Sequence, residues 1–124
     1  MAKFLSNIDK GTLKNYKEIY TSPTISTGQL TLDLSNGNVF NVSLNANITI
    51  MTISNIPSSS FAGSFTLIFT ADGTPRGVAW APAIKWPSGT APTLTSTNGK
   101  RDVFSFVTTD GGTNWYGFVG GQNI

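Results

Sequence analysis

The sequence predicts an all-β protein, and three observations lead to this prediction. Apolar residues alternate with polar ones in several short runs, such as Leu30, Leu32 and Leu34, and a period of two is that of a half-buried strand. Turn dipeptides such as Asn36-Gly37 and Asn98-Gly99 separate the runs, as in sheets with short connections. Ser, Thr and Asn supply about a third of the chain and charged residues only 11%, a composition typical of β surfaces and turns.

The length of the chain limits the fold to one core. A chain of 124 residues has room for a single domain. About eight strands with regularly spaced turns favour an antiparallel sandwich over a fold in which strands and helices alternate. We therefore expect a jelly-roll-like antiparallel β-sandwich over residues 29–124, with a β-barrel as the alternative. Residues 1–28 are expected to form an extended N-terminal arm and a linker.

The first two strands are expected over residues 30–34 and 40–44, which show the clearest alternation in the chain. Asn36-Gly37 lies between them, and this dipeptide supplies the positive φ angles of a tight turn. The pattern therefore predicts a β-hairpin.

The next two predicted strands differ in how clearly their faces are defined. Over residues 48–53 the apolar side changes between Ile48 and Met51, so either a bulge turns the strand or both of its faces are buried. Over residues 63–70 the alternation is regular, which indicates a central strand. Burying a Phe contributes roughly 1.5 to 3 kcal/mol, so Phe65→Ala is expected to be among the most damaging substitutions.

The C-terminal part of the chain begins with an interrupted strand and ends with a hairpin. Pro82 divides the apolar run over residues 78–86, and because proline cannot donate a ladder hydrogen bond this run is expected at a sheet edge or corner. Asp110-Gly111-Gly112-Thr113 predicts a hairpin turn. Strands are expected over residues 93–97, 102–108 and 114–120.

The N-terminal arm differs from the rest of the chain in charge. Residues 1–20 hold the whole net charge of +2, and the remaining residues are balanced. A basic stripe on the folded domain, which nucleic acid binding would require, is therefore not expected. Leu13, Tyr16, Ile19 and Tyr20 follow helical spacing, so one or two helical turns are predicted, with an apolar side that another surface has to cover.

The residue inventory argues against catalysis. The sequence contains no histidine and no cysteine, so the usual general base, activated nucleophile and soft metal ligands are missing. We expect no enzyme and no cofactor or metal. Asp72 and Asp110 each precede a glycine and are expected as turn residues, with a Ca²⁺ site as the alternative. The N-terminal residues show no long apolar run, so neither a signal peptide nor a membrane span is expected.

Four aromatic residues admit two interpretations. Trp80, Trp86, Trp115 and Tyr116 lie near polar residues on predicted strands and loops. An exposed Trp or Tyr offers a flat apolar face to a sugar ring, whereas aromatic residues also dominate cores and subunit interfaces. Packing is the favoured interpretation, and Trp86, between Lys85 and Pro87, is the most site-like of the four.

Four segments carry long, ordered motifs. They begin as Leu30-Thr-Leu-Asp-Leu-Ser-Asn-Gly, Gly63-Ser-Phe-Thr-Leu-Ile-Phe-Thr, Lys85-Trp-Pro-Ser-Gly-Thr-Ala-Pro and Val103-Phe-Ser-Phe-Val-Thr-Thr-Asp-Gly-Gly. Together these segments resemble a β module that recurs in virion proteins of tailed bacteriophages, and the similarity covers roughly residues 16–124. The start of the chain, Met1-Ala-Lys-Phe-Leu-Ser-Asn-Ile-Asp, is similar to the openings of phage structural proteins.

The resemblance implies a structural protein of the virion, assembled in the cytoplasm of a bacterial host. In that family the module occurs at the ends of fibres and in small separate virion proteins, and about 28 residues before the module are too few for a fibre shaft. The expected function is therefore that of a capsid decoration, or cement, protein, a trimer that binds the major capsid protein. Its arm is expected to contact the shell through Lys3, Lys10, Lys14, Tyr16, Lys17 and Tyr20.

The same resemblance leaves a second function open. A receptor- or glycan-binding tip of a tail or head fibre would use the exposed aromatic residues. Trp86, Trp115 and Tyr116 are the residues expected to form that site, or to form an interface between subunits.

Overall fold

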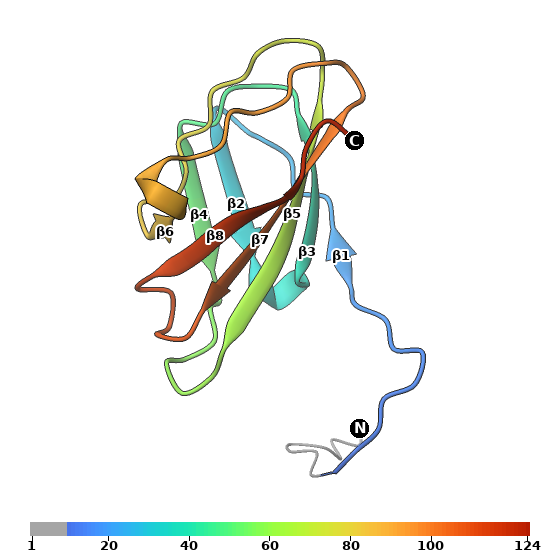
Figure 1. Ribbon diagram of the computed structural model, residues 1–124, viewed down its shortest axis with the longest axis vertical. Coiled ribbons are helices and arrows are strands. Elements are labelled where there is room, and N and C mark those ends of the chain that lie inside the picture. Colours follow the sequence, from blue (N-terminus) through green and yellow to red (C-terminus); the bar gives the residue numbers. More distant parts are fainter. Residues whose placement is uncertain (1–9) are drawn as a thin grey trace.

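The computed structural model describes residues 10–124 and confirms an all-β fold (Figure 1). A six-stranded sheet has the order β1-β3-β5-β7-β8-β6, and a second sheet consists of β2 and β4. Two short 3-10 turns accompany the strands, η1 (Leu34–Asn36) and η2 (Pro87–Gly89). The strands are β1 (Tyr20–Thr21), β2 (Gln29–Asp33), β3 (Val39–Leu44), β4 (Ile50–Ser54), β5 (Gly63–Ala71), β6 (Ile84–Lys85), β7 (Arg101–Thr108) and β8 (Trp115–Gly121).

The first five strands alternate between the two sheets along the chain. β1, β3 and β5 lie in the six-stranded sheet, whereas β2 and β4 form the other, and neighbours in each group run parallel. The predicted hairpin over residues 30–44 is therefore wrong, because an arch joins β2 and β3 across the two sheets. The prediction of antiparallel pairing holds for β5 with β7 and β7 with β8, while the other four strand pairs are parallel.

The burial pattern explains why the chain crosses between sheets. Leu30 and Leu32 on β2 and Phe40 and Val42 on β3 are all buried in one core cluster. A half-buried strand needs a second apolar layer opposite its own apolar face. In an arch, two consecutive strands supply this layer to each other, whereas in a hairpin both would lie on the same side of the core.

The arch between β2 and β3 has its own local stabilisation. The Asp33 carboxylate accepts hydrogen bonds from the Ser35 backbone N–H at 2.9 Å and from the Ser35 hydroxyl at 2.7 Å, which caps η1. Gly37 follows with φ 145°. A Cβ at Gly37 would collide with the carbonyl oxygen of Ile19, so glycine allows the residue before β1 to pass close to the arch.

The change of face near residue 50 comes from an irregularity before β4. The carbonyl oxygen of Gly28 accepts from the backbone N–H groups of both Thr49 (2.7 Å) and Ile50 (3.2 Å). Two residues therefore oppose one, as at a β-bulge. Ile48 and Met51 are both buried, whereas Ile50 is 53% exposed. Of the two alternatives drawn from the sequence, the structure supports the bulge.

The C-terminal strands follow the sequence more closely. β5 lies inside the six-stranded sheet between β3 and β7, and β7 and β8 form the predicted hairpin. β6 lies at the edge of that sheet, as expected from Pro82. The strand predicted over residues 93–97 is wrong. There the chain forms a loop whose Thr95 N–H donates to the Asp102 carboxylate at 2.7 Å instead of to a neighbouring strand.

Both sheets contribute to one core. Phe65 lies at its aromatic centre, with ring centroids 4.7 Å from Phe106, 5.0 Å from Trp115 and 5.7 Å from Phe40. These contacts connect the parallel N-terminal strands with the C-terminal hairpin. A buried aromatic pair contributes about 0.5–1.5 kcal/mol beyond its buried area, so Phe65 joins the two parts of the fold.

Candidate functional site

The arm that precedes β1 is exposed along its described length. Residues 10–19 contain no helix or strand, and Figure 1 shows this segment leading away from the two sheets. Leu13 is 67% exposed and Tyr16 69%. The predicted helical turns are therefore wrong for this segment. Two of its residues, Lys10 and Asn15, have positive φ angles of 60° and 55°, which a right-handed helix does not accommodate.

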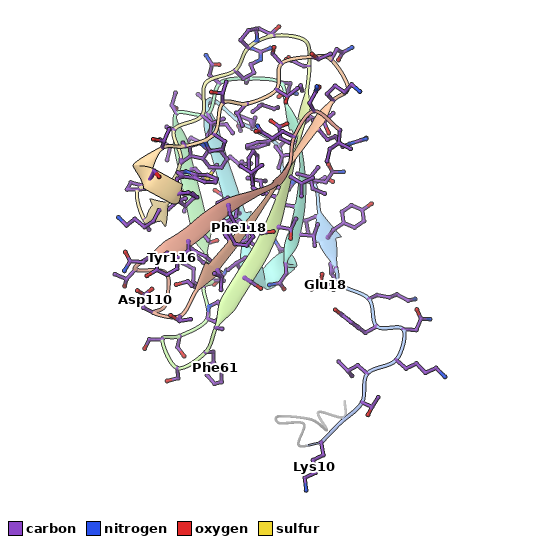
Figure 2. The ribbon with its side chains drawn as sticks, in the orientation of Figure 1. Lys10, Glu18, Phe61, Asp110, Tyr116 and Phe118 are labelled. Carbon is purple, nitrogen blue, oxygen red and sulfur yellow. The ribbon has the colours of Figure 1, made fainter. Side chains whose placement is uncertain are left out.

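The lysines of the predicted contact set lie on this arm. Lys10, Lys14 and Lys17 are exposed, and Figure 2 shows Lys10 at the end of the described segment, far from the sheets. Lys3 lies outside the described residues. The arm joins the body at β1, where Tyr20 pairs with Val39 and Thr21 with Phe40.

The three aromatic residues proposed as a site do not come together. Trp115 is only 1% exposed and belongs to the core, which confirms packing for this residue and removes it from the surface. Trp86 is half-buried and packs edge-to-face on Trp80 at 4.9 Å between ring centroids. Tyr116 points to the side of β8 opposite to Trp115 and is 52% exposed. Figure 2 shows it beside Phe118.

Two hollows lie on the outer face of the six-stranded sheet, on the side away from the core. The first has a volume of about 360 Å³ and is lined mostly by polar residues. The second has a volume of about 380 Å³ and a more apolar lining. Asn41 lines both hollows, so they are adjacent. Residues 22–25, Asn41, Ser43, Asn45, Thr70 and Arg101 line the first, and Glu18, Tyr20, Val39, Asn41 and Ile68 line the second.

The strand register brings the lining residues of the first hollow to one end of the sheet. Ser43 on β3 pairs with Thr70 on β5, and Thr70 pairs with Arg101 on β7. The parallel strands β3 and β5 end at this edge and the antiparallel β7 begins there. Sequence reasoning missed this site, because the outward positions of each strand are visible in the sequence but their neighbours depend on the crossing topology.

Asp33, Asp72 and Asp110 have structural partners at turns. The pKa of Asp33 is lowered by hydrogen bonds, of which the one from the Asn55 amide has the largest effect and those from Ser35 a smaller one. The Arg76 guanidinium lowers the pKa of Asp72. The Asn114 backbone and side chain lower that of Asp110.

These partners confirm the turn roles predicted for Asp72 and Asp110. The Thr74 N–H donates to Asp72 at 3.1 Å and the Asn114 N–H donates to Asp110 at 2.9 Å. Over residues 10–124 no group of three or more His, Cys, Asp or Glu side chains is placed to hold a metal ion.

Asp102 is the one aspartate that is fully buried in the described part of the chain, at 2% exposure. Burial raises its pKa, but hydrogen bonds from the Thr95 and Asn123 backbone N–H groups and from the Gln122 amide outweigh burial and lower the pKa overall. The carboxylate therefore ties β7 to the preceding loop and to the last residues of the chain.

Comparison with known proteins assigns no family to the chain. It matches no family model, no curated protein and no solved structure. Among residues 10–124 no helix has the length and apolar character needed to cross a membrane.

Proposed function

We propose that this chain is a structural virion protein of a tailed bacteriophage that decorates the assembled head and binds the major capsid protein through its N-terminal arm. One observation carries the proposal. The arm exposes three large apolar side chains, Leu13, Tyr16 and Ile19, with exposed fractions of 67% to 72%, on a segment that leads away from the body. Tyr20, in β1 where the arm joins the body, is 64% exposed.

The chemistry of the arm suits attachment to a larger assembly. Burying an apolar side chain of this size stabilises a complex by roughly 1.5–3 kcal/mol before the cost of ordering the arm is subtracted. Lys10, Lys14 and Lys17 surround these residues and would add electrostatic attraction to an acidic shell surface. The resemblance to phage virion modules, drawn from the sequence, supports the same function.

The proposal extends to the architecture and the oligomer. We infer that the two sheets face each other as a jelly-roll-like sandwich. It departs from the expected antiparallel form in that four of its six strand pairs are parallel. A trimer would bury the half-exposed apolar residues on the outer face of the six-stranded sheet, which include Val103, Val107 and Phe118. The fibre-tip alternative loses one of its three proposed site residues, because Trp115 is in the core.

A binding experiment with capsids lacking this protein tests the proposed function. Removal of residues 1–18 leaves β1 in place, so the body is expected to fold as before and to lose capsid binding in co-sedimentation. Leu13→Ser combined with Tyr16→Ser is expected to weaken binding strongly. Phe61→Ser is the matched control, because Phe61 is 66% exposed on the loop before β5 (Figure 2). Undiminished binding of the truncated chain would refute the role of the arm.

The location of the protein on the virion tests the wider claim. A cryo-electron microscopy reconstruction of the particle is expected to show its density repeated over the capsid lattice. Density confined to a tail or head fibre would contradict the decoration function.

A further inference from the structure

We propose that the two adjacent hollows form one groove that binds a saccharide carrying a carboxylate, with Arg101 as the partner of the carboxylate and Tyr20 as a platform for a sugar ring. Apart from Tyr20, which also belongs to the predicted capsid-contact set, the site is separate from the arm residues used for attachment in the proposed function. Each hollow, at about 360 and 380 Å³, falls in the size range of small-ligand sites, roughly 300–1,000 Å³. Together they can hold more than one sugar unit.

The side chains lining the first hollow are free to bind a ligand. Over residues 10–124, none of its polar side chains makes a hydrogen bond to another part of the protein, whereas Asn38, Asn47, Asn55 and Asn114 outside it are each bonded to backbone or carboxylate groups. Sugar hydroxyls both donate and accept hydrogen bonds, which matches amide and hydroxyl side chains. The unpaired polar side chains are Ser22, Thr24, Asn41, Ser43, Asn45, Thr70 and Arg101.

Charge gives the ligand its orientation. Arg101 is the one charged side chain that lines the first hollow, and Glu18 is the one that lines the second. A guanidinium binds a carboxylate through two parallel hydrogen bonds, while Glu18 would repel an anion. The acidic group therefore belongs at Arg101 and an uncharged ring at the other end. The backbone of Arg101 is held by hydrogen bonds to Ile124 at 2.9 and 3.0 Å, which fixes the base of this side chain.

The second hollow offers an apolar surface for that ring. Tyr20 is 64% exposed, and its pairing with Val39 on β3 holds its backbone beside the hollow. Val39 and Ile68 are half-buried and line the same hollow. An aromatic face beside aliphatic side chains packs against the C–H groups of a sugar ring. A single arginine surrounded by neutral groups favours a carboxylate sugar over phosphate, which is usually held by several cations or backbone N–H groups.

The test uses the full chain and two pairs of matched saccharides, followed by ¹⁵N–¹H NMR titration. Trigalacturonate is compared with galactotriose, and sialyllactose with lactose. We expect at least one acidic saccharide to shift the amide signals of residues 41–45, 70 and 101, and to bind more tightly than its neutral partner. Shifts confined to β8, no binding by either acidic saccharide, or equal binding by inorganic phosphate would each overturn the proposal.

Variants separate the two ends of the groove. Arg101→Gln is expected to reduce affinity for the acidic saccharide about tenfold and to leave the neutral one unchanged, whereas Tyr20→Ala is expected to weaken both. Lys85→Gln, at the opposite edge of the sheet, is the control for a nonspecific charge effect. Unchanged tryptophan fluorescence, to which the buried Trp115 contributes, would show that each variant is folded. Equal losses for Arg101→Gln and Lys85→Gln would refute a specific carboxylate site.

Discussion

The N-terminal strands and the C-terminal hairpin use similar turn sequences for different connections. Asn36-Gly37 lies in an arch between two sheets, whereas Gly111-Gly112 lies in a hairpin within one sheet. In the hairpin both glycines have positive φ, 71° and 85°. In the arch Asn36 lies in a 3-10 turn and Gly37 alone of the pair has positive φ. A turn dipeptide therefore permits a hairpin without determining one.

Side-chain capping distinguishes the two connections further. In the hairpin, the Thr108 hydroxyl accepts from the Gly112 N–H at 3.0 Å and donates to Asp110 at 2.9 Å, so the turn is closed by its own residues. In the arch, Asp33 also accepts from the Asn55 amide at 2.7 Å, 22 residues away. The arch depends on tertiary structure, and the hairpin is local.

The largest expected effect comes from breaking the contact that joins the two regions. Phe65→Ala removes ring contacts to Phe40 on one side and to Phe106 and Trp115 on the other. The free energy of unfolding is expected to fall by about 3–5 kcal/mol. Urea denaturation followed by tryptophan fluorescence measures this loss.

A control with an exposed phenylalanine makes the result specific. Phe61→Ala removes the same side chain from the loop before β5, where Phe61 is 66% exposed, and is expected to cost less than about 1 kcal/mol. Equal losses for the two variants would contradict the assignment of Phe65 to the shared core.

The next largest effect is expected at Asp102, which holds the C-terminal region together. Asp102→Ala leaves the N–H groups of Thr95 and Asn123 without their partner, at a cost of about 2–3 kcal/mol. The pKa of Asp102 is below its ordinary value of 3.8, so the unfolded chain takes up a proton first as the pH falls. The contribution to stability is present above pH 3.8 and is lost below it as the pH falls through the native pKa.

The pH dependence provides the check for Asp102. As the pH falls below 3.8, wild-type stability is expected to fall more steeply than that of Asp102→Asn, because the variant has one fewer carboxylate to protonate. Identical slopes in urea titrations would show that the carboxylate charge at this position does not stabilise the fold.

A smaller and more local effect is expected at Gly37. Gly37→Ala places a Cβ against the Ile19 carbonyl oxygen and is expected to cost about 1–2 kcal/mol. Because Ile19 directly precedes β1, amide exchange at Thr21 is expected to accelerate while exchange in β7 stays slow. Gly89→Ala is the control, since Gly89 also has positive φ, 69°, but open space around it. Faster exchange at Thr21 in both variants would contradict the steric explanation.

The sequence predicted the strands better than their partners. Alternation located β3, β5 and β7, because each has a strictly alternating buried face, and the turn Asp110-Gly111-Gly112-Thr113 located β8. Pairing could not be predicted from the same pattern, since Leu30 and Phe40 satisfy a hairpin and an arch equally well. The strand predicted over residues 93–97 was wrong because the backbone N–H of Thr95 donates to the buried carboxylate of Asp102, 7 residues away, and not to a neighbouring strand.

The candidate sites show the same limit. The charge of the arm was readable from composition, and the exposed positions of Lys10, Lys14 and Lys17 agree with it. The groove could not be predicted from the sequence, because Ser43 and Arg101 are brought together only by Thr70, on the strand between them. Trp115 and Tyr116 are adjacent in sequence and were grouped, but successive strand residues point to opposite faces.

The smallest effects separate the tertiary cap of the arch from the local cap of the hairpin. Asp33→Ala and Asp110→Ala each remove a half-buried capping carboxylate, and both are expected to lower the urea midpoint less than removal of the fully buried Asp102 carboxylate in Asp102→Ala does. Asn55→Asp places a second carboxylate next to Asp33 and is expected to destabilise at pH 7 through repulsion. Combined with Asp33→Ala, Asn55→Asp should cost less than it does alone, because the repelling partner is gone. Strict additivity in this double-mutant cycle would mean that Asp33 and Asn55 do not interact in solution, and the arch would then be no more dependent on tertiary structure than the hairpin.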